Sequence, residues 1–311
     1  MNQPGIKRKG VVFTALSALL FGFTPILAAE TYDMGSNPET LTFYRNLFAS
    51  LILLAVVLLR GTSLKISGRL FRDILVAGVL GGGVTTLMLY SSYQYVGVGT
   101  ATTLHFLYPV FVALICRFFY REKLGAAKVA ALVIASAGVL FFLERSQAGG
   151  LTGMVLAAAS GLTYACYMVI MDKKNLKNID PFFFSFYMAL VVSAAMLCYN
   201  LFSGKIHFLL SPKAYSYTFV VAVCTSFLAV ALLQLGVRYL SATTAAILCL
   251  FEPIASSLAG WLFLHEAMTG AKIAGSVLIF AAVAVLMAKK PDGEKTYRDK
   301  PVILGNTREK Q

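Results

Sequence analysis

Apolar residues dominate this chain in ten runs, which are separated by short segments rich in polar residues, glycine or proline. A run of about 20 apolar residues crosses a hydrocarbon core about 30 Å thick as a helix. The pattern therefore predicts an all-α integral membrane protein with ten transmembrane helices. The runs cover residues 10–29, 38–59, 73–95, 99–120, 125–143, 151–171, 181–203, 215–237, 242–264 and 268–288.

The second half of the chain repeats the first. Residues 10–143 and 151–288 each hold five of the apolar runs, and residues of the same type recur at a nearly constant spacing. The spacing grows by one position after Tyr44, which indicates a one-residue insertion in the second copy. Equivalent pairs are Ser17/Ser160, Pro38/Pro181 and Tyr44/Tyr187 at 143 positions, and Pro109/Pro253, Glu122/Glu266 and Lys128/Lys272 at 144.

An odd number of spans in each half means that the second copy enters the membrane upside down. The halves are then two inverted five-helix repeats related by a pseudo-two-fold axis in the membrane plane. Secondary transporters are built in this way, with a binding site between the repeats near the bilayer midplane. Alternating access follows as a hypothesis, because exchanging the conformations of the two halves would open the site to the other side.

The basic residues are distributed unevenly between the two sides of the predicted membrane. If the N-terminus is cytoplasmic, 22 of the 27 Lys and Arg residues fall in cytoplasmic segments. This asymmetry follows the positive-inside rule and predicts cytoplasmic N- and C-termini. The net charge of +13 is then a sign of topology and not of nucleic-acid binding. Residues 289–311 are mostly polar and are expected to form a disordered cytoplasmic tail.

Composition excludes several other classes of protein. Hydrophobic residues make up 58% of the chain and charged residues 13%, which is far from a soluble domain. The five cysteines lie in apolar runs without a CxxC pair, so neither a disulfide nor a metal site is expected. A nucleotide-hydrolysis motif is absent, which favours a gradient as the energy source and gives no reason to expect a cofactor. One intramembrane histidine and no aspartate in the membrane interior argue against an enzyme.

Several motifs in both copies are typical of one known family. They are Phe43-Tyr44-Arg45-Asn46, Tyr95, Ala101, Pro109, Glu122 and Gly138 in the first copy, and Glu252-Pro253, Gly260-Trp261 and Glu266 in the second. With these residues the chain, apart from its two ends, resembles a transporter of the drug/metabolite transporter superfamily that is built from EamA-type repeats. The resemblance implies ten helices, with helices 1, 3, 4, 6, 8 and 9 around a central cavity, and substrates such as amino acids, other metabolites, sugar derivatives or drugs.

The repeat also separates scaffold from candidate site residues. Positions shared by both halves are expected to be scaffold, and Pro109 and Pro253 are expected to kink their helices. Positions that are polar in only one half are better candidates for a site. Ionisable residues are the strongest of these, because a charge within the bilayer costs about 2.5–3.5 kcal/mol on insertion scales. Three intramembrane residues are ionisable in one half only: Glu252 is equivalent to Tyr108, Arg45 to Met188, and His105 to Cys249.

Each of these three residues has a functional and a structural interpretation. Glu252 could contact the substrate or carry a coupling proton, or it could form a hydrogen bond to a neighbouring helix. Arg45 could bind a carboxylate or phosphate through its planar guanidinium, or it could cap helix carbonyls, pair with Glu252 or extend to the outer membrane interface. His105 lies one turn before Pro109, where a bond between helices is the simpler explanation.

Polar and aromatic residues on equivalent helix faces complete the set of candidates. Such faces suit a cavity for a small amphipathic solute, although ordinary bonds between helices explain each residue equally well. The candidates are Ser17 and Thr24 in the first run, Tyr90 and Gln94 in the third, Tyr164 and Tyr167 in the sixth, and Gln234 in the eighth.

The leading hypothesis is an exporter of an amino acid or a related small metabolite in the cell (inner) membrane, which the short loops fit. Its direction and substrate come from the family resemblance. An exporter of drugs or lipophilic cations is the alternative, and an exchanger of phosphorylated sugars ranks third because only Arg45 is a clear basic residue for the cavity. The expected partners are the solute, the lipid bilayer and a coupling proton, and both a monomer and a homodimer stay open.

Overall fold

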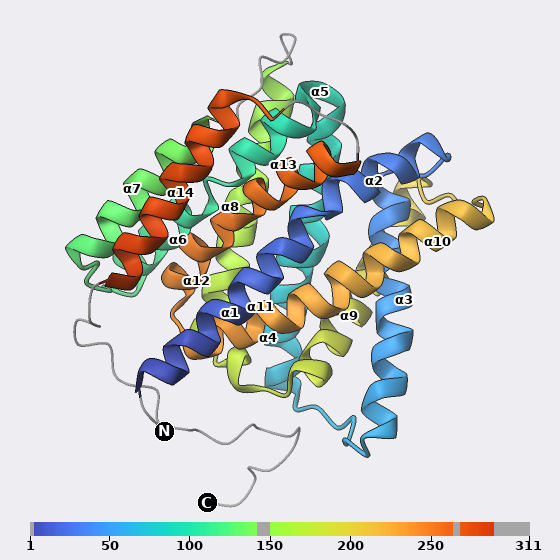
Figure 1. The fold of residues 1–311 in the computed structure, drawn as a ribbon. Helices are drawn as coiled ribbons and strands as arrows, with labels where there is room; N and C mark the ends of the chain where they lie inside the picture. Colours follow the sequence, from blue (N-terminus) through green and yellow to red (C-terminus); the bar gives the residue numbers. More distant parts are fainter. Residues whose placement is uncertain (1–2, 142–149, 264–267, 289–311) are drawn as a thin grey trace, which may run out of the picture.

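The computed structural model describes residues 3–141, 150–263 and 268–288, and all regular structure within these ranges is helical (Figure 1). Eight segments in these ranges are long and apolar enough to span a bilayer, and α7 and α14 are two shorter apolar helices. The prediction of a ten-helix membrane protein is therefore confirmed. Glu266 and the tail 289–311 lie outside the described residues.

The first five spans are built from seven α-helices and one π-helical segment. α1 and α2 together form the first span, and α4, η1 and the start of α5 form the third. The elements are α1 (Gln3–Gly22), α2 (Thr24–Asp33), α3 (Pro38–Leu59), α4 (Gly68–Gly78), η1 (Val79–Val84), α5 (Thr85–His105), α6 (Tyr108–Phe119) and α7 (Ala126–Leu140).

The second five spans repeat this plan. α10, η3 and α11 form the eighth span, and α12, η4 and α13 form the ninth. The elements are α8 (Leu151–Lys173), η2 (Leu176–Asn178), α9 (Pro181–Ser203), α10 (Pro212–Val221), η3 (Ala222–Ala229), α11 (Val230–Tyr239), α12 (Ala242–Leu248), η4 (Cys249–Phe251), α13 (Glu252–Phe263) and α14 (Gly270–Ala288).

Helix starts are specified by the same chemistry in both halves. Asn37 and Asp180 occupy equivalent positions, each just before a proline, and each side chain accepts hydrogen bonds from backbone N–H groups in the first turn of α3 or α9. Such caps satisfy N–H groups that have no partner within the helix. α9 has 23 residues and α3 has 22, so the one-residue insertion lies within the second span of the second copy.

The two halves are interleaved and not merely adjacent. α1 packs against α11 and α13 of the second half, and α8 packs against α5 and α6 of the first. α3 packs against α9, and α7 lies beside α14 (Figure 1). Each contact between the halves thus recurs with the equivalent helices exchanged. This is the packing expected of two repeats related by a two-fold axis.

The start of α1 and the end of α14 lie on the same side of the bundle, which we call the terminal face (Figure 1). The loop between α3 and α4 and the segment between α8 and α9 lie on the same side, because each connects spans that end there. We call the other side the opposite face. Which of the two faces the cytoplasm is still a prediction from the charge asymmetry.

Both fourth spans lose their regular α-helical form near the middle, directly before a proline. α5 ends at His105 and α6 begins at Tyr108, one residue before Pro109. In the second half, η4 is a short 3₁₀ turn, and α13 begins at Glu252, one residue before Pro253. A proline removes the hydrogen bond to the carbonyl four residues earlier, so both predicted interruptions have the same cause.

The third and fourth spans differ between the halves at the point where they connect. We expected a short connection near residues 95–99, but α5 stays helical from Thr85 to His105. In the second half the corresponding helices separate, with Tyr239 ending α11 and Ala242 beginning α12. Ser241 caps α12 by accepting a hydrogen bond from the Thr244 N–H, which marks the start of a new helix.

Candidate functional site

A cavity of about 120 Å³ lies at the centre of the bundle, where the two halves meet. A volume of this size holds several water molecules or a small solute. Residues of spans one, three, four, six, eight and nine line it, as the family resemblance implied. The second and seventh spans also contribute, through Arg45, Asn46, Met188 and Val192.

Arg45 projects into this cavity from α3 and is only 8% exposed. Its Nη2 donates a hydrogen bond to Thr86 Oγ1 at 2.8 Å, and its Nη1 lies 3.4 Å from both Tyr90 OH and Thr225 Oγ1. The guanidinium carbon is 5.7 Å from the centre of the Tyr90 ring. These neutral groups fix the position of the guanidinium but leave its positive charge uncompensated.

Glu252 is the first residue of α13 and is 7% exposed. Within the described residues its Oε1 has no hydrogen-bond partner, and no basic side chain forms an ion pair with it. The start of a helix favours negative charge, because its N–H groups and dipole point outward there. α1 approaches this point closely, since a Cβ at Gly22 would lie 2.8 Å from the carbonyl oxygen of Glu252.

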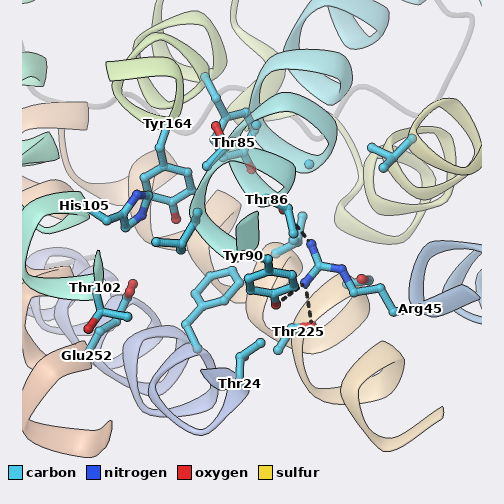
Figure 2. Close-up of a pocket in the computed structure, with 18 of the residues that line it drawn as sticks. Thr24, Arg45, Thr85, Thr86, Tyr90, Thr102, His105, Tyr164, Thr225 and Glu252 are labelled. Carbon is cyan, nitrogen blue, oxygen red and sulfur yellow. Dashed lines mark hydrogen bonds between the residues drawn. The ribbon is translucent and has the colours of Figure 1, made fainter. Parts of the chain in front are cut away.

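Arg45 and Glu252 lie on opposite sides of the cavity, with Tyr90 between them (Figure 2). They do not form the ion pair that the sequence left open. The guanidinium Nε of Arg45, like Glu252 Oε1, is buried without a partner in the part of the chain that the structure describes. The cavity therefore presents a cation and an acid that are not neutralised by one another.

His105 lines the cavity on the same side as Glu252 (Figure 2). Its Nδ1 is 2.9 Å from Ser160 Oγ of α8, so the expected bond between helices is present. α8 comes close here because residue 161 is glycine, where a Cβ would lie 2.8 Å from the carbonyl oxygen of His105. That carbonyl is the one whose helical partner Pro109 removes.

Aromatic rings make up much of the remaining wall. The Tyr164 ring centre lies 4.8 Å from that of Tyr108 and 5.6 Å from that of Tyr167, and the Tyr90 and Tyr93 rings are 5.6 Å apart. Four hydroxyl oxygens of lining residues are buried with no partner among the described residues. These are the side-chain oxygens of Thr24, Tyr93, Tyr167 and Ser226. Buried polar atoms without protein partners are available to bind water or a solute.

Seven of the ten predicted binding residues line the cavity, and three do not. Ser17 donates to the Ala229 carbonyl at 2.8 Å and holds α1 against η3. Gln94 is exposed and lies outside the cavity wall. Gln234 Nε2 donates to the Leu176 and Ile179 carbonyls at 2.7 and 3.1 Å, so it connects α11 to the terminal face. The seven that line it are Glu252, Arg45, His105, Tyr90, Thr24, Tyr164 and Tyr167.

Thr86 and Thr225, which position Arg45, were not among the predicted residues. Both satisfy the criterion used for the ionisable residues, because Thr225 is equivalent to Gly81 and Thr86 to Val230. Restricting that criterion to charged side chains missed them. A wider search for positions that are polar in one half only would have found both.

Charged and polar groups join the two halves at the terminal face. Lys173 at the end of α8 pairs with Glu122 after α6, and its Nζ is 5.2 Å from the Tyr120 ring centre. Arg60 Nη1 lies 3.4 Å from Asp180 Oδ2, and its guanidinium carbon is 4.5 Å from the Phe182 ring centre. The pairs Lys173–Glu122 and Arg60–Asp180 each join a residue of one half to a residue of the other.

The described residues hold no group of three or more His, Cys, Asp or Glu side chains arranged to bind a metal. All five cysteines are free thiols. The cavity is lined by polar side chains and aromatic rings.

Comparison with known proteins agrees with this architecture. A protein from Archaeoglobus fulgidus, named only as an uncharacterized transporter, is 26% identical over 278 residues, which cover 89% of this chain and 96% of that protein. Human solute carrier family 35 member G1 is 26% identical over 202 residues, covering 58% of this chain and 54% of its own. One solved crystal structure has a TM-score of 0.75 at 17% identity, covers 90% and 96% of the two chains, and supports the fold.

The family model for the EamA-like transporters matches both halves, over residues 8–143 and 151–288. The two matched segments coincide with the two predicted repeats and include every residue of the cavity wall. The chain therefore belongs to the EamA-like transporter family, and it is a multi-pass membrane transporter of the drug/metabolite transporter superfamily.

Proposed function

We propose that this transporter exports an amino acid or a closely related zwitterionic metabolite by alternating access. The observation that carries the proposal is the placement of Arg45 and Glu252 on opposite walls of one central cavity, each without an ionic partner among the described residues. A zwitterion presents a carboxylate and an ammonium group and would compensate both charges at once.

Arg45 is the group proposed for the carboxylate. Its planar guanidinium suits two oxygens of a carboxylate, and its hydroxyl partners hold it without consuming its charge. A charge within the bilayer costs about 2.5–3.5 kcal/mol on insertion scales. An arginine held there by neutral groups alone is therefore suited to bind an anionic group of a substrate.

Glu252 is the group proposed for the ammonium and also for a coupling proton. A carboxyl with no fixed cation beside it can exchange a proton for a substrate cation without breaking an ion pair. Alternating access is supported by the inverted repeats and by the interrupted fourth spans, which are common features of secondary transporters. Export as the direction rests on the family resemblance.

A transporter of lipophilic cations is the second candidate, because a carboxyl beside several aromatic rings also suits an organic cation. Such a substrate would use Glu252 and the tyrosines but not Arg45. The two candidates therefore differ in their dependence on Arg45.

Counterflow in proteoliposomes separates them. The panel would contain leucine, phenylalanine and threonine, a sugar phosphate, and tetraphenylphosphonium, each tested with and without a pH gradient. The amino-acid proposal predicts saturable exchange of an amino acid that is lost in both Arg45→Gln and Glu252→Gln. Exposed Arg72, which pairs with Asp73, provides the matched control Arg72→Gln. Exchange of tetraphenylphosphonium that is insensitive to Arg45→Gln would favour the second candidate.

A further inference from the structure

The bond between His105 and Ser160 determines which nitrogen of His105 carries a proton. Ser160 Oγ lies 2.6 Å from the Ala157 carbonyl, to which its hydroxyl donates. The same oxygen lies 2.9 Å from His105 Nδ1. A hydroxyl has one proton, and that proton is already used, so Nδ1 must be the donor in the second bond.

A neutral imidazole that donates from Nδ1 has a lone pair on Nε2 and acts there as an acceptor. No hydrogen bond to Nε2 occurs within the described residues, although His105 lines the cavity and is only 6% exposed. An imidazole nitrogen that lines a cavity and has no protein partner is available to accept a hydrogen bond from a ligand or water.

The surroundings of His105 hold the ring in one orientation. Its centre lies 5.5 Å from that of Tyr108 and 5.4 Å from that of Tyr164. His105 ends α5 and Glu252 begins α13, so the two residues flank equivalent interruptions of the fourth spans. Both lie on the side of the cavity away from Arg45 (Figure 2).

We infer that His105 Nε2 and the Glu252 carboxylate together form a cation subsite that requires an N–H donor, with Ser160 as its positioning residue. This inference rests on the proposed function. It adds a selectivity: a primary ammonium supplies hydrogen bonds to both groups, whereas a quaternary ammonium leaves Nε2 without a partner. The second candidate function, which includes quaternary cations, would not use this arrangement.

The assignment of the His105 proton to Nδ1 can be tested by NMR without a substrate. The chain contains three histidines, so ¹⁵N-histidine labelling and subtraction of the His105→Gln spectrum identify the His105 signals. The expected result at pH 7 is a protonated Nδ1 and an unprotonated Nε2, with a change in this tautomer in Ser160→Ala. Protonation at Nε2 would overturn the inference, and so would a spectrum that Ser160→Ala leaves unchanged.

The selectivity is tested by binding of leucine and of its N,N,N-trimethyl derivative to the purified protein. Loss of a hydrogen bond to a charged group corresponds to binding about 10- to 100-fold weaker, so wild type should prefer leucine by that factor. His105→Gln retains an acceptor and should keep the preference, whereas His105→Phe should abolish it while leucine still binds.

The outcomes separate the two proposals. Equal binding of both compounds to wild type, or a preference that survives in His105→Phe, would overturn the cation subsite and leave the amino-acid proposal intact. Binding of neither compound, with counterflow of no other amino acid, would overturn the amino-acid proposal and the subsite with it.

Discussion

At the residue scale, three hydroxyl groups orient the buried guanidinium of Arg45 within the membrane-spanning bundle. Thr225 Oγ1 lies 2.7 Å from the Val221 carbonyl and donates its proton there, so its oxygen is left to accept from Arg45. Tyr90 and Thr86 complete the set from α5. The hydrogen bonds fix the orientation of the guanidinium and leave its charge without an anionic partner among the described residues.

The shape of the guanidinium should therefore matter as well as its charge. Arg45→Lys retains the charge but loses the planar group that three hydroxyls orient. We expect the half-saturation concentration for amino-acid counterflow to rise at least about tenfold, which corresponds to about 1.4 kcal/mol of binding free energy. Thr225→Ser, which retains the hydroxyl, is the control and should stay near wild type. An unchanged affinity in Arg45→Lys would show that substrate binding depends on the positive charge at this position and not on the planar guanidinium.

The carboxyl of Glu252 should control the response of transport to pH. Glu252→Gln keeps the shape and polarity of the side chain but cannot exchange a proton. If this residue carries the coupling proton, transport by the variant should be driven by a solute gradient and no longer by a pH gradient. The measurement is proteoliposome uptake at fixed substrate with pH gradients of either direction. A pH response equal to that of wild type would assign coupling elsewhere.

The ionisable part of the site could be predicted from sequence, because the internal repeat identified Arg45, Glu252 and His105 as residues found in one half only. The polar faces were less informative. Gln94 and Gln234 fit the periodicity of a cavity-facing stripe, yet one is exposed and the other bonds to backbone carbonyls. Periodicity defines a face of a helix but not which neighbour that face meets.

At the element scale, both third spans contain a π-helical segment at equivalent positions, η1 and η3. A π segment widens the helix locally and is frequent at functional sites. In η1 the chain is Gly81-Gly82-Gly83, which lets neighbouring side chains approach the backbone. A Cβ at Gly81 would lie 2.5 Å from Tyr167 Cγ, and one at Gly82 would lie 2.6 Å from Val192 Cγ2.

Gly81→Ala should consequently destabilise the protein by displacing the Tyr167 ring. Overpacking of this kind costs about 1–3 kcal/mol, so the midpoint of thermal unfolding in detergent should fall. Gly68→Ala is the matched control, since a Cβ there has no neighbour within 4 Å. Equal midpoints for the two variants would mean that η1 adjusts to the added methyl group.

The ten spans followed from the apolar runs, but the form of several spans did not. The two π segments pack against helices that are distant in sequence, η1 against α8 and α9, and η3 against α1 and α3. The local sequence pattern does not specify such contacts, so it did not predict the π segments. The interruptions before Pro109 and Pro253 were predictable, since proline has a local steric effect. The continuous helix across residues 95–99 was not predictable, because a connection this short contains too few residues to distinguish a turn from a helix.

At the scale of the whole molecule, equivalent positions on the two faces are bonded differently. On the terminal face, Gln234 donates to two carbonyls of the segment between α8 and α9. Its counterpart Tyr90 bonds to Arg45 instead. The opposite face is also bonded between the halves, because Asn37 Nδ2 donates to the Lys205 carbonyl at 2.7 Å and the His207 N–H donates to Thr40 Oγ1 at 2.9 Å. Both faces thus carry bonds between the halves, but residues at different positions of the repeat make them.

Gln234→Leu should weaken closure of the terminal face, because the apolar side chain cannot hold the Leu176 and Ile179 carbonyls. We expect faster amide hydrogen exchange over residues 174–180, measured by mass spectrometry of the purified protein. Gln94→Leu is a control of the same chemistry at an exposed position outside the cavity wall. Unchanged exchange in Gln234→Leu would mean that the ion pairs of Arg60 and Lys173 are sufficient for closure.

The interleaved packing has a consequence for how the protein is made. Ser17 of α1 bonds to the Ala229 carbonyl, 212 positions later in the chain. α1 therefore enters the membrane long before α11 and α13, against which it packs, have been synthesised. Until then its polar residues must be tolerated by lipid or by an insertion factor. Biogenesis of this transporter is completed only near the end of translation, and a chain truncated before α11 leaves its first helix without its permanent neighbours.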